Sequence, residues 1–244
     1  MAEVVARQPV AAPPWDALPD VEEAPGSVRP YLRIFGKFLI SVGVGVLLFV
    51  AWTLWGTGLY TAGQQERLGQ ELDRRIATAE VPRDRGGGRV GPPRRFAPGP
   101  GEPVFRMKIP EIGLSAVVVE GVGTADLRKG PGHYPSCRAG FERPFCTNFE
   151  EAWPGQRGRV VLSGHRTTYG AEFHRVDELD PGDEITIESE WGTFVYRVTG
   201  QEIVQPDSRK VVVPGDAAEL ALTTCNPKYS AAERLIVYAE LDKT

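Results

Sequence analysis

The sequence lacks a surplus of positive charge, since it has 28 Lys and Arg residues and 32 Asp and Glu residues, which gives a net charge of -4. Nucleic-acid-binding domains carry a clear basic surplus, so this composition speaks against a nucleic-acid partner. Cysteine and histidine are also scarce, with three residues of each in 244. An odd number of thiols leaves at least one outside any disulfide, and in an exported chain such a thiol is a candidate for a reactive role.

Charge is absent altogether between Lys37 and Glu66, and residues 38–60 are almost entirely apolar. A helix of that length spans about 34 Å, which matches a hydrocarbon core of roughly 30 Å. A run that is apolar on every side has no face for water, which disfavours a buried core helix, and the run is too long for a cleaved signal peptide. Residues 38–60 are therefore predicted to form a transmembrane helix.

The flanks of this segment indicate its orientation. Arg29, Arg33 and Lys37 precede it, whereas no Lys or Arg follows it before Arg67. Because basic residues accumulate on the cytoplasmic side of a membrane span, the N-terminus is predicted to be cytoplasmic and everything after the span extracellular. The chain is thus expected to be a single-pass protein of the cell membrane.

Two further regions lack the marks of a folded domain. Residues 1–28 are rich in Pro, Ala and acidic side chains and are predicted to be a disordered cytoplasmic tail. Residues 61–101 are predicted to hold a short extracellular helix with an apolar stripe (Leu68, Leu72, Ile76), followed by a Gly/Pro/Arg-rich linker. The linker's arginines either contact anionic membrane lipid headgroups or are simply solvated. No candidate catalytic group lies in these regions, so we expect an active domain to remain without them.

Residues 102–244 have the texture of a β-domain. Short runs rich in Val, Ile, Leu, Phe and Tyr alternate with turn residues, and no long helical pattern intervenes. This pattern is typical of an all-β barrel or sandwich. The predicted strands are 104–109, 116–120, 159–163, 184–188, 193–204, 219–224 and 234–241.

Cys225 closes one of these strands, where the sheet holds the backbone while a side chain faces a groove, a position that suits a nucleophile. The two residues before it, Thr223 and Thr224, are polar, whereas an ordinary core strand avoids consecutive polar side chains. A buried structural cysteine is the alternative. An unperturbed thiol is only a few per cent ionised at neutral pH, so a cysteine nucleophile needs a base or a cation nearby.

The three histidines differ as candidates for that base. His165 follows an apolar strand, and Gly164 keeps the backbone beside it open. His174 lies in a mixed stretch and is expected to be structural or solvated. His133 lies in a turn, where it either lines a groove or is structural.

Arg234 is the candidate cation. It opens the last predicted strand, nine residues after Cys225. If the loop between them lets the two strands run side by side, their adjoining ends place the guanidinium next to the thiol. A fixed guanidinium there can donate to an oxyanion, although an arginine at the start of a strand is more often a surface residue.

These segments resemble the catalytic segments of sortases. Residues 222–225 (LTTC) and 234–237 (RLIV) look like the family's cysteine and arginine segment, and 163–170 (SGHRTTYG) looks like its histidine segment. The likeness extends over roughly residues 103–243. The motifs GHRTTYG and GPGHYP are together most similar to those of class E sortases, with class D second.

The resemblance implies a closed eight-stranded β-barrel of the sortase type, with no obligatory cofactor and no metal. It also implies cleavage of an LPxTG- or LAxTG-like C-terminal sorting signal between Thr and Gly, and transfer of the secreted protein to a peptidoglycan precursor amine. Cys225 would form a thioester, Arg234 would stabilise the oxyanion and His165 would move the protons. The residues expected to contact substrate are Thr223, Thr224, His133 and Tyr134.

Two features depart from the family pattern. Ala221 stands where sortases commonly have Thr. An insertion over about residues 136–157 contains Cys137 and Cys146, which lie close together on the extracellular side and are predicted to form a disulfide that leaves Cys225 free. Because the insertion borders the groove by its sequence position, it is expected to affect substrate preference.

Three other functions stay open. Pilin-polymerising sortases use the same residues but often carry a C-terminal membrane segment, and since this chain stops directly after its last strand, housekeeping anchoring of proteins to the cell wall is favoured. A hydrolytic cysteine peptidase would use the same residues with water as the acceptor. A non-catalytic, membrane-tethered β-domain would leave Cys225 inert.

Overall fold

The structure is a computed structural model that describes residues 28–79, 91–92 and 96–242. The predicted cytoplasmic tail, apart from its last residue, and most of the predicted linker lie outside these residues. The chain divides into two compact units, Met1–Leu47 and Leu48–Thr244.

Helix α1 (Arg29–Ala51) supplies the apolar segment of the chain. The part of this helix from Pro30 to Ala51 has a mean hydropathy of 2.3 and is long enough to cross a membrane. In the described part of the chain, it is the one helix with these properties. The predicted N-terminal apolar helix is therefore present as a candidate membrane anchor. A π-helix, η2 (Trp52–Gly56), follows. The last residues of the predicted span belong to the next helix, α2 (Thr57–Thr78).

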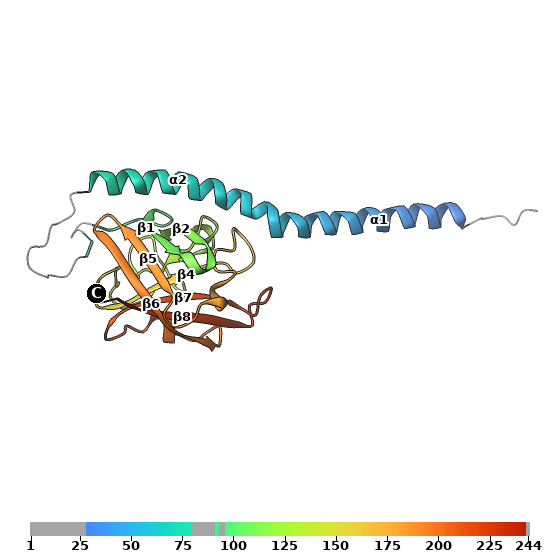
Figure 1. Cartoon of the computed structure of the whole chain (residues 1–244). Helices are drawn as coiled ribbons and strands as arrows, with labels where there is room; N and C mark the ends of the chain where they lie inside the picture. Colours follow the sequence, from blue (N-terminus) through green and yellow to red (C-terminus); the bar gives the residue numbers. More distant parts are fainter. Residues whose placement is uncertain (1–27, 80–90, 93–95, 243–244) are drawn as a thin grey trace, which may run out of the picture. The chain divides into compact units, whose positions relative to one another are not determined.

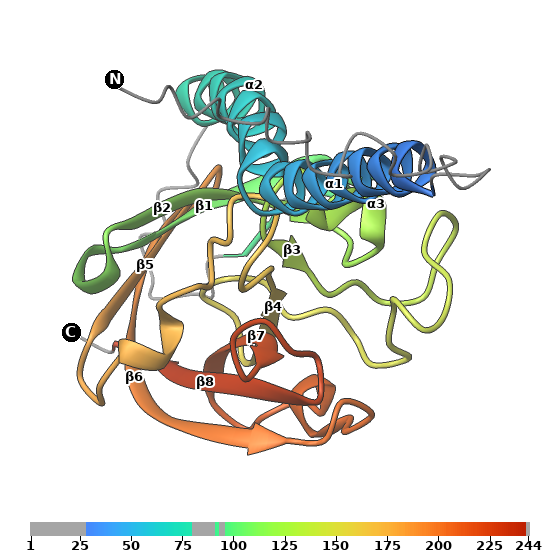
Figure 2. The same ribbon diagram turned by 90° about the vertical axis from the view of Figure 1, so that its right-hand side faces the viewer.

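Eight strands form one closed barrel, which confirms the fold that the family resemblance implied. Around the barrel they follow the order β1-β2-β3-β4-β7-β8-β6-β5 (Figure 1, Figure 2). The strands are β1 (Pro103–Ile109), β2 (Leu114–Glu120), β3 (Gly132–His133), β4 (Gly158–Ser163), β5 (Glu184–Ser189), β6 (Gly192–Val204), β7 (Ala218–Asn226) and β8 (Glu233–Leu241). Short helical turns in the connections are η3 (Pro110–Ile112), α3 (Thr124–Leu127), η4 (Val176–Glu178) and η5 (Lys210–Val212).

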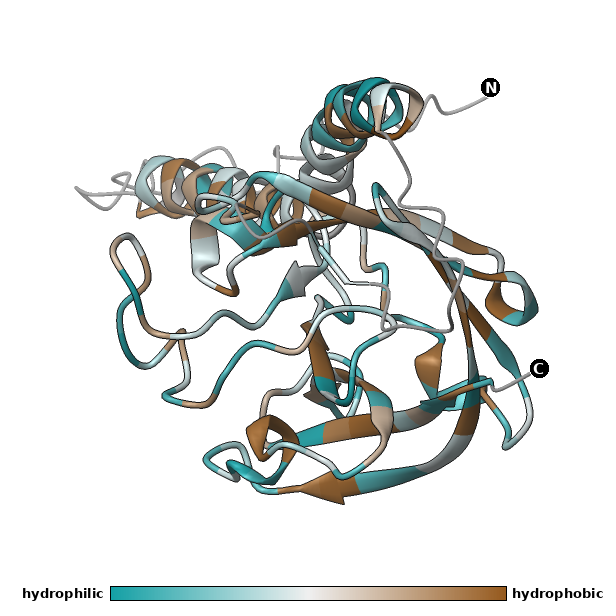
Figure 3. Ribbon diagram, turned by 90° about the vertical axis from the view of Figure 1, so that its left-hand side faces the viewer, coloured by the Kyte–Doolittle hydropathy of each residue, from teal (hydrophilic) through white to brown (hydrophobic). Residues whose placement is uncertain are grey.

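Alternation along the strands separates the barrel interior from its outer face, and Figure 3 shows it as bands of hydrophobic and hydrophilic colour. In β7, Leu220 and Leu222 belong to the main core, whereas Ala221 belongs to a second apolar cluster. Successive residues of a strand face opposite sides. Ala221, Thr223 and Cys225 therefore share the outer face of the barrel.

Helix α2 packs against the outside of β1 and β2, as both Figure 1 and Figure 2 show. Leu68 and Leu72 are buried against valines of β2, so the predicted apolar stripe packs on the barrel. Gln65 pairs with the backbone of Val117, donating to its oxygen at 2.9 Å and accepting from its N–H at 2.7 Å. Removing all residues before the linker would uncover this apolar surface, so a shortened chain should keep α2 from Thr57 onward.

Strand β3 is the element of the barrel that the sequence pattern missed. Its two residues lie in a Gly/Pro-rich segment that reads as a turn, and a strand this short has no alternation to detect. It pairs in parallel with β2 and antiparallel with β4, and so closes the barrel. The other seven strands begin and end within two residues of their predicted limits.

Candidate active site

The carboxyl ends of two parallel strands bring Cys225 and His165 to one place. Strands β4 and β7 pair in parallel, with Ser163 opposite Thr223. Cys225 and His165 each lie two residues beyond this pair, so both emerge at the same edge of the sheet. Cys225 is a free thiol and is partly exposed.

Thr224 holds the segment that carries His165. Its Oγ1 donates to the backbone oxygen of Gly164 at 2.8 Å, and the Gly164 N–H donates to the oxygen of Thr223 at 3.1 Å. A Cβ at Gly164 would lie 2.7 Å from the ring of Phe173, so this position has no room for a side chain. Thr224 is 3% exposed and acts on the chain next to His165.

Arg166 connects the segment of His165 to the segment of Cys225, a contact that the sequence pattern did not indicate. Its Nη1 donates to the backbone oxygen of Cys225 at 3.1 Å and to Asn226 Oδ1 at 2.8 Å. Its Nη2 lies 2.9 Å from Asp177 Oδ2. A charge this buried, at 4% exposure, must be paired to be tolerated. Here the pairing fixes the histidine segment to the backbone of Cys225. The signal in the sequence that could have indicated Arg166 was its position directly after His165.

Arg234 is the register partner of Cys225 in the antiparallel pair of β7 and β8, so the two strands do run side by side. Residues directly opposite in such a pair point to the same face, with Cβ atoms roughly 4.5–5.5 Å apart. Arg234 and Cys225 therefore leave the sheet side by side on the same face. The Nη1 of Arg234 donates to the backbone oxygens of Glu233 at 2.9 Å and Ala231 at 3.1 Å, which hold the side chain at the start of β8.

The imidazole of His165 is partly buried, and its Nε2 has no hydrogen-bond partner among the described residues. The ring of Tyr169 lies 5.2 Å away, centroid to centroid. Burial, and then the positive charge of Arg128, lower the pKa of His165. An imidazole that is neutral near pH 7 can accept a proton and can release it readily once it is charged.

A groove of about 650 Å³ opens on the outer face of β4, β7 and β8. Ser163, Thr223 and Arg234 lie along its floor. One wall comes from residues 143–149 of the predicted insertion, and the other comes from residues 204–213, between β6 and β7. Of the three candidate groups, Arg234 lines this groove, and Cys225 lies opposite Arg234 in the strand register. The groove can take an extended peptide.

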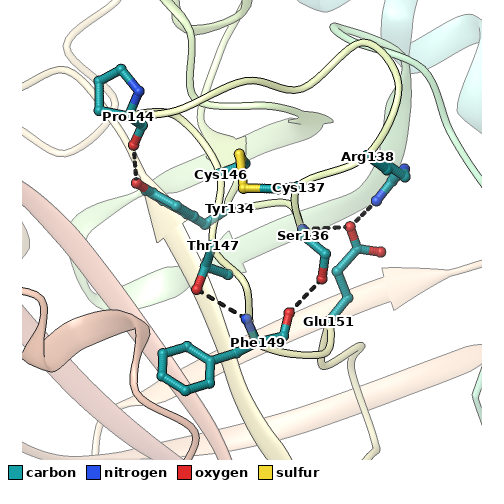
Figure 4. The surroundings of a disulfide bond; sticks show 9 residues. All are labelled: Tyr134, Ser136, Cys137, Arg138, Pro144, Cys146, Thr147, Phe149 and Glu151. Carbon is teal, nitrogen blue, oxygen red and sulfur yellow. Dashed lines mark hydrogen bonds and ion pairs between the residues drawn. A yellow bond between two sulfur atoms is a disulfide. The ribbon is translucent and has the colours of Figure 1, made fainter.

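The insertion is closed by a disulfide between Cys137 and Cys146, as predicted (Figure 4). Tyr134 lines the groove, and its hydroxyl donates to the backbone oxygen of Pro144 at 2.6 Å. The disulfide and this hydrogen bond hold the wall that the insertion contributes. Tyr134 is therefore placed both to border a ligand and to fix the loop above it.

The other two histidines are engaged within the protein. His133 is 1% exposed, with Nδ1 2.8 Å from Glu120 Oε2 and Nε2 3.3 Å from the oxygen of Ala152. His174 Nδ1 lies 2.8 Å from the backbone oxygen of Arg166. Within residues 28–79, 91–92 and 96–242, no group of three or more His, Cys, Asp or Glu side chains is arranged to bind a metal ion.

Known proteins are similar to this chain in sequence. Sortase SrtE1 of Streptomyces coelicolor is 28% identical over 228 residues, which cover 89% of this chain and 59% of that protein. The chain thus spans less than two thirds of that relative's length. Sortase D of Bacillus subtilis is 33% identical over 149 residues, which cover 59% of this chain and 67% of that protein.

A solved structure agrees with the fold. The SrtF sortase from Corynebacterium diphtheriae matches with a TM-score of 0.51 and 28% identity, covering 64% of this chain and 92% of that one. The Sortase domain family model matches residues 107–242, which include Cys225, His165 and Arg234. Because this match extends over more than half of the sequence, the chain belongs to the sortase family.

Proposed function

We propose that this chain is a membrane-anchored cysteine transpeptidase that acts on secreted proteins with a C-terminal LPxTG- or LAxTG-like sorting signal. It cleaves the signal between Thr and Gly and transfers the protein to a peptidoglycan amine, which is the housekeeping form of cell-wall anchoring. One observation carries the proposal. The strand registers set Arg234 opposite Cys225 and let Cys225 and His165 follow from the same edge of the sheet, and Arg234 lines a groove.

In the first half-reaction, His165 takes the proton of the Cys225 thiol, and the resulting thiolate attacks the carbonyl carbon of the substrate Thr. Negative charge builds on the carbonyl oxygen, and Arg234 donates to that oxygen from its position opposite the nucleophile. As the C–N bond to Gly breaks, protonated His165 donates its proton to the leaving amine. The products are a thioester on Cys225 and a free peptide that begins with Gly.

In the second half-reaction, an amine attacks the thioester carbon. His165 takes the proton that the amine loses. Cys225 leaves as the thiolate, and an amide bond joins the substrate protein to the cell-wall precursor. Arg234 donates to the second oxyanion as it did to the first.

The groove supports an extended peptide as the substrate. Thr223 and Tyr134 border it, and residues of the segment 143–149 line it as well. Because that segment belongs to the disulfide-closed insertion, we assign to the insertion a part in choosing the residues upstream of the cleaved bond.

The proposed location is the cell membrane, with the N-terminus in the cytoplasm and the barrel outside. The basic residues before the apolar helix favour this orientation. The disulfide between Cys137 and Cys146 favours it as well, because disulfides persist in oxidising surroundings. Both secreted substrates and cell-wall precursors are accessible there.

The test is incubation of the full chain in detergent with a panel of LPxTG- and LAxTG-like peptides, with and without triglycine as the amine. We expect a mass increase on Cys225 equal to the N-terminal fragment of the peptide, and a ligated product when triglycine is present. Cys225→Ala should abolish both. A chain with Cys137→Ser and Cys146→Ser is the matched control and should still form the thioester.

Three outcomes would replace the proposal. Hydrolysis that added amine never diverts would indicate a hydrolytic cysteine peptidase. A strong preference for the lysine side chain of a pilin subunit over small amines would indicate a pilin-polymerising enzyme. No adduct with any peptide, together with resistance of Cys225 to alkylation in the folded chain, would indicate a non-catalytic β-domain.

A further inference from the structure

The first turns of helix α2 touch the two segments that surround the imidazole of His165. Thr57 Oγ1 accepts a hydrogen bond from the backbone N–H of Tyr169 at 3.2 Å. One turn later, Thr61 Oγ1 donates to the backbone oxygen of Arg128 at 2.9 Å. Thr61 is 2% exposed, so this hydroxyl is buried between the helix and the barrel unit.

The loop after His165 reaches α2 by an unusual backbone path. Tyr169, Gly170 and Ala171 have φ values of 51°, 88° and 50°, all in the left-handed region. Such conformations are unfavourable for side-chain-bearing residues and persist only where the surroundings hold them. A Cβ at Gly170 would lie 3.2 Å from Thr61 Cγ2, which shows how closely helix and loop approach.

The ring of Tyr169 is a neighbour of the imidazole itself, and Arg128 packs on that ring. The rings of Tyr169 and His165 are tilted by 36° with their centroids 5.2 Å apart. The guanidinium carbon of Arg128 lies 5.5 Å from the centre of the Tyr169 ring, in cation–π contact. The two threonines of α2 therefore hold the backbones of Tyr169, which lies against His165, and of Arg128, which lies against Tyr169.

We propose that Thr57 and Thr61 are positioning residues, which orient His165 for proton transfer by holding Tyr169 and Arg128. The inference rests on the proposed transpeptidase function. It extends the proposed active site beyond the barrel to α2, the helix that directly follows η2 in the chain.

The two threonines can be changed without loosening α2 from the barrel, because the apolar residues that pack this helix lie further along it. Leu68 and Leu72 are buried against the valines of β2 two turns and more along the helix. Replacing a threonine by valine keeps its shape but removes the hydroxyl that reaches the loop. Thr78 is the matched control, since it lies in the same helix, is exposed, and donates only to backbone oxygens of the helix, those of Arg74 and Arg75.

The first readout is the rate of thioester formation by the full chain in detergent. Thr57→Val and Thr61→Val should each lower kcat by roughly tenfold, because a small displacement of a catalytic group has effects of this size or larger. KM should change by less than about twofold, since neither threonine lines the groove. Thr57→Ser and Thr61→Ser keep the hydroxyl and should restore the rate, and Thr78→Val should match the wild type.

The second readout does not depend on activity. The chain has three histidines, so ¹³C-labelled histidine gives three imidazole signals, and His165→Ala identifies the one from the site. We expect Thr57→Val and Thr61→Val to move the titration midpoint or the chemical shift of His165 while the signals of His133 and His174 stay in place. Arg128→Gln should raise the midpoint of His165, because it removes a nearby positive charge.

The outcomes are distinct. If the imidazole signal of His165 in both valine variants coincides with that of the wild type and kcat stays within twofold, the positioning role is wrong. A wild-type chain that forms no thioester would refute the proposed function, and the imidazole signals would still decide the positioning role. Thermal melts of each variant separate a local effect from loss of folding.

Discussion

Glu172 lies in the loop that follows His165, and its surroundings do little to stabilise a negative charge on its carboxyl group. Both of its oxygens are buried, and neither has a hydrogen-bond partner on another residue in the described part of the chain. Burial raises the pKa of Glu172 to about 7 from an ordinary value of 4.5. The folded protein therefore has a reason to keep this group protonated that the unfolded chain lacks.

The sign of the pH effect follows from proton binding. Between pH 4.5 and 7 the folded state holds the Glu172 proton more tightly than the unfolded state does, so the free energy of unfolding falls as pH rises through this window. The gap in pKa, at ~1.4 kcal/mol per unit, sets a ceiling of about 3.4 kcal/mol on the loss above pH 7. Because the side chain is only partly buried, we expect about 1–3 kcal/mol.

Glu172→Gln removes the ionisation and keeps the shape. We expect the variant to be more stable than the wild type by about 1–3 kcal/mol at pH 8, and by much less at pH 4.5. For a chain of this size, that corresponds to a rise in melting temperature of roughly 2–10 °C at pH 8.

The assay is thermal unfolding of the full chain in detergent from pH 4.5 to 8.5. Glu142→Gln is the control, because Glu142 is exposed in the insertion, and its melting curves should follow the wild type at every pH. A constant stabilisation at all pH values would mean that packing, and not ionisation, explains the effect. No stabilisation at pH 8 would refute the reasoning about Glu172.

Three further predictions concern the site and its support. Arg234→Ala should lower the rate of thioester formation by roughly a hundredfold or more, with Arg234→Lys intermediate and both melting near the wild type; rates within twofold, measured by mass spectrometry in single turnover, would remove Arg234 from the mechanism. The double variant Cys137→Ser, Cys146→Ser should raise KM for sorting peptides more than it lowers kcat. Denaturant unfolding should show a loss of stability on the order of 2–3 kcal/mol. An unchanged KM would exclude the insertion from substrate binding. A chain that begins after α2 should be less stable than one that begins at Thr57 by several kcal/mol, since it loses the burial of Leu68 and Leu72, and equal melting temperatures would contradict this.

The sequence alone was sufficient for the elements whose signal is local. Alternating apolar residues located seven of the eight strands to within two residues, because one face of each strand must be buried whatever its partners are. The uncharged run after Lys37 likewise predicted an apolar helix, which the structure begins at Arg29. Two cysteines close together in sequence predicted the disulfide of Cys137 and Cys146, because a short loop can bring them together without help from the rest of the fold.

The cysteine and arginine of the site were also within reach of the sequence. Eight residues separate Cys225 from Arg234, and so short a connection makes an antiparallel pair the simplest arrangement, which brings Cys225 and Arg234 to adjoining strand ends. His165 could be singled out as the histidine at a strand end, but its closeness to Cys225 depends on the parallel pairing of β4 and β7, which lie far apart in sequence.

Only the tertiary structure decided which residues support Cys225, His165 and Arg234. Strand β3 exists because β2 and β4 hold two residues between them, and Arg166 has its role because the backbone of Cys225 arrives beside it. Thr57 and Thr61 look like ordinary helix residues until Tyr169 and Arg128 are folded against them. Each of these contacts joins segments that are distant in sequence, and no local pattern records such a contact, because its energy depends on where the rest of the chain has packed.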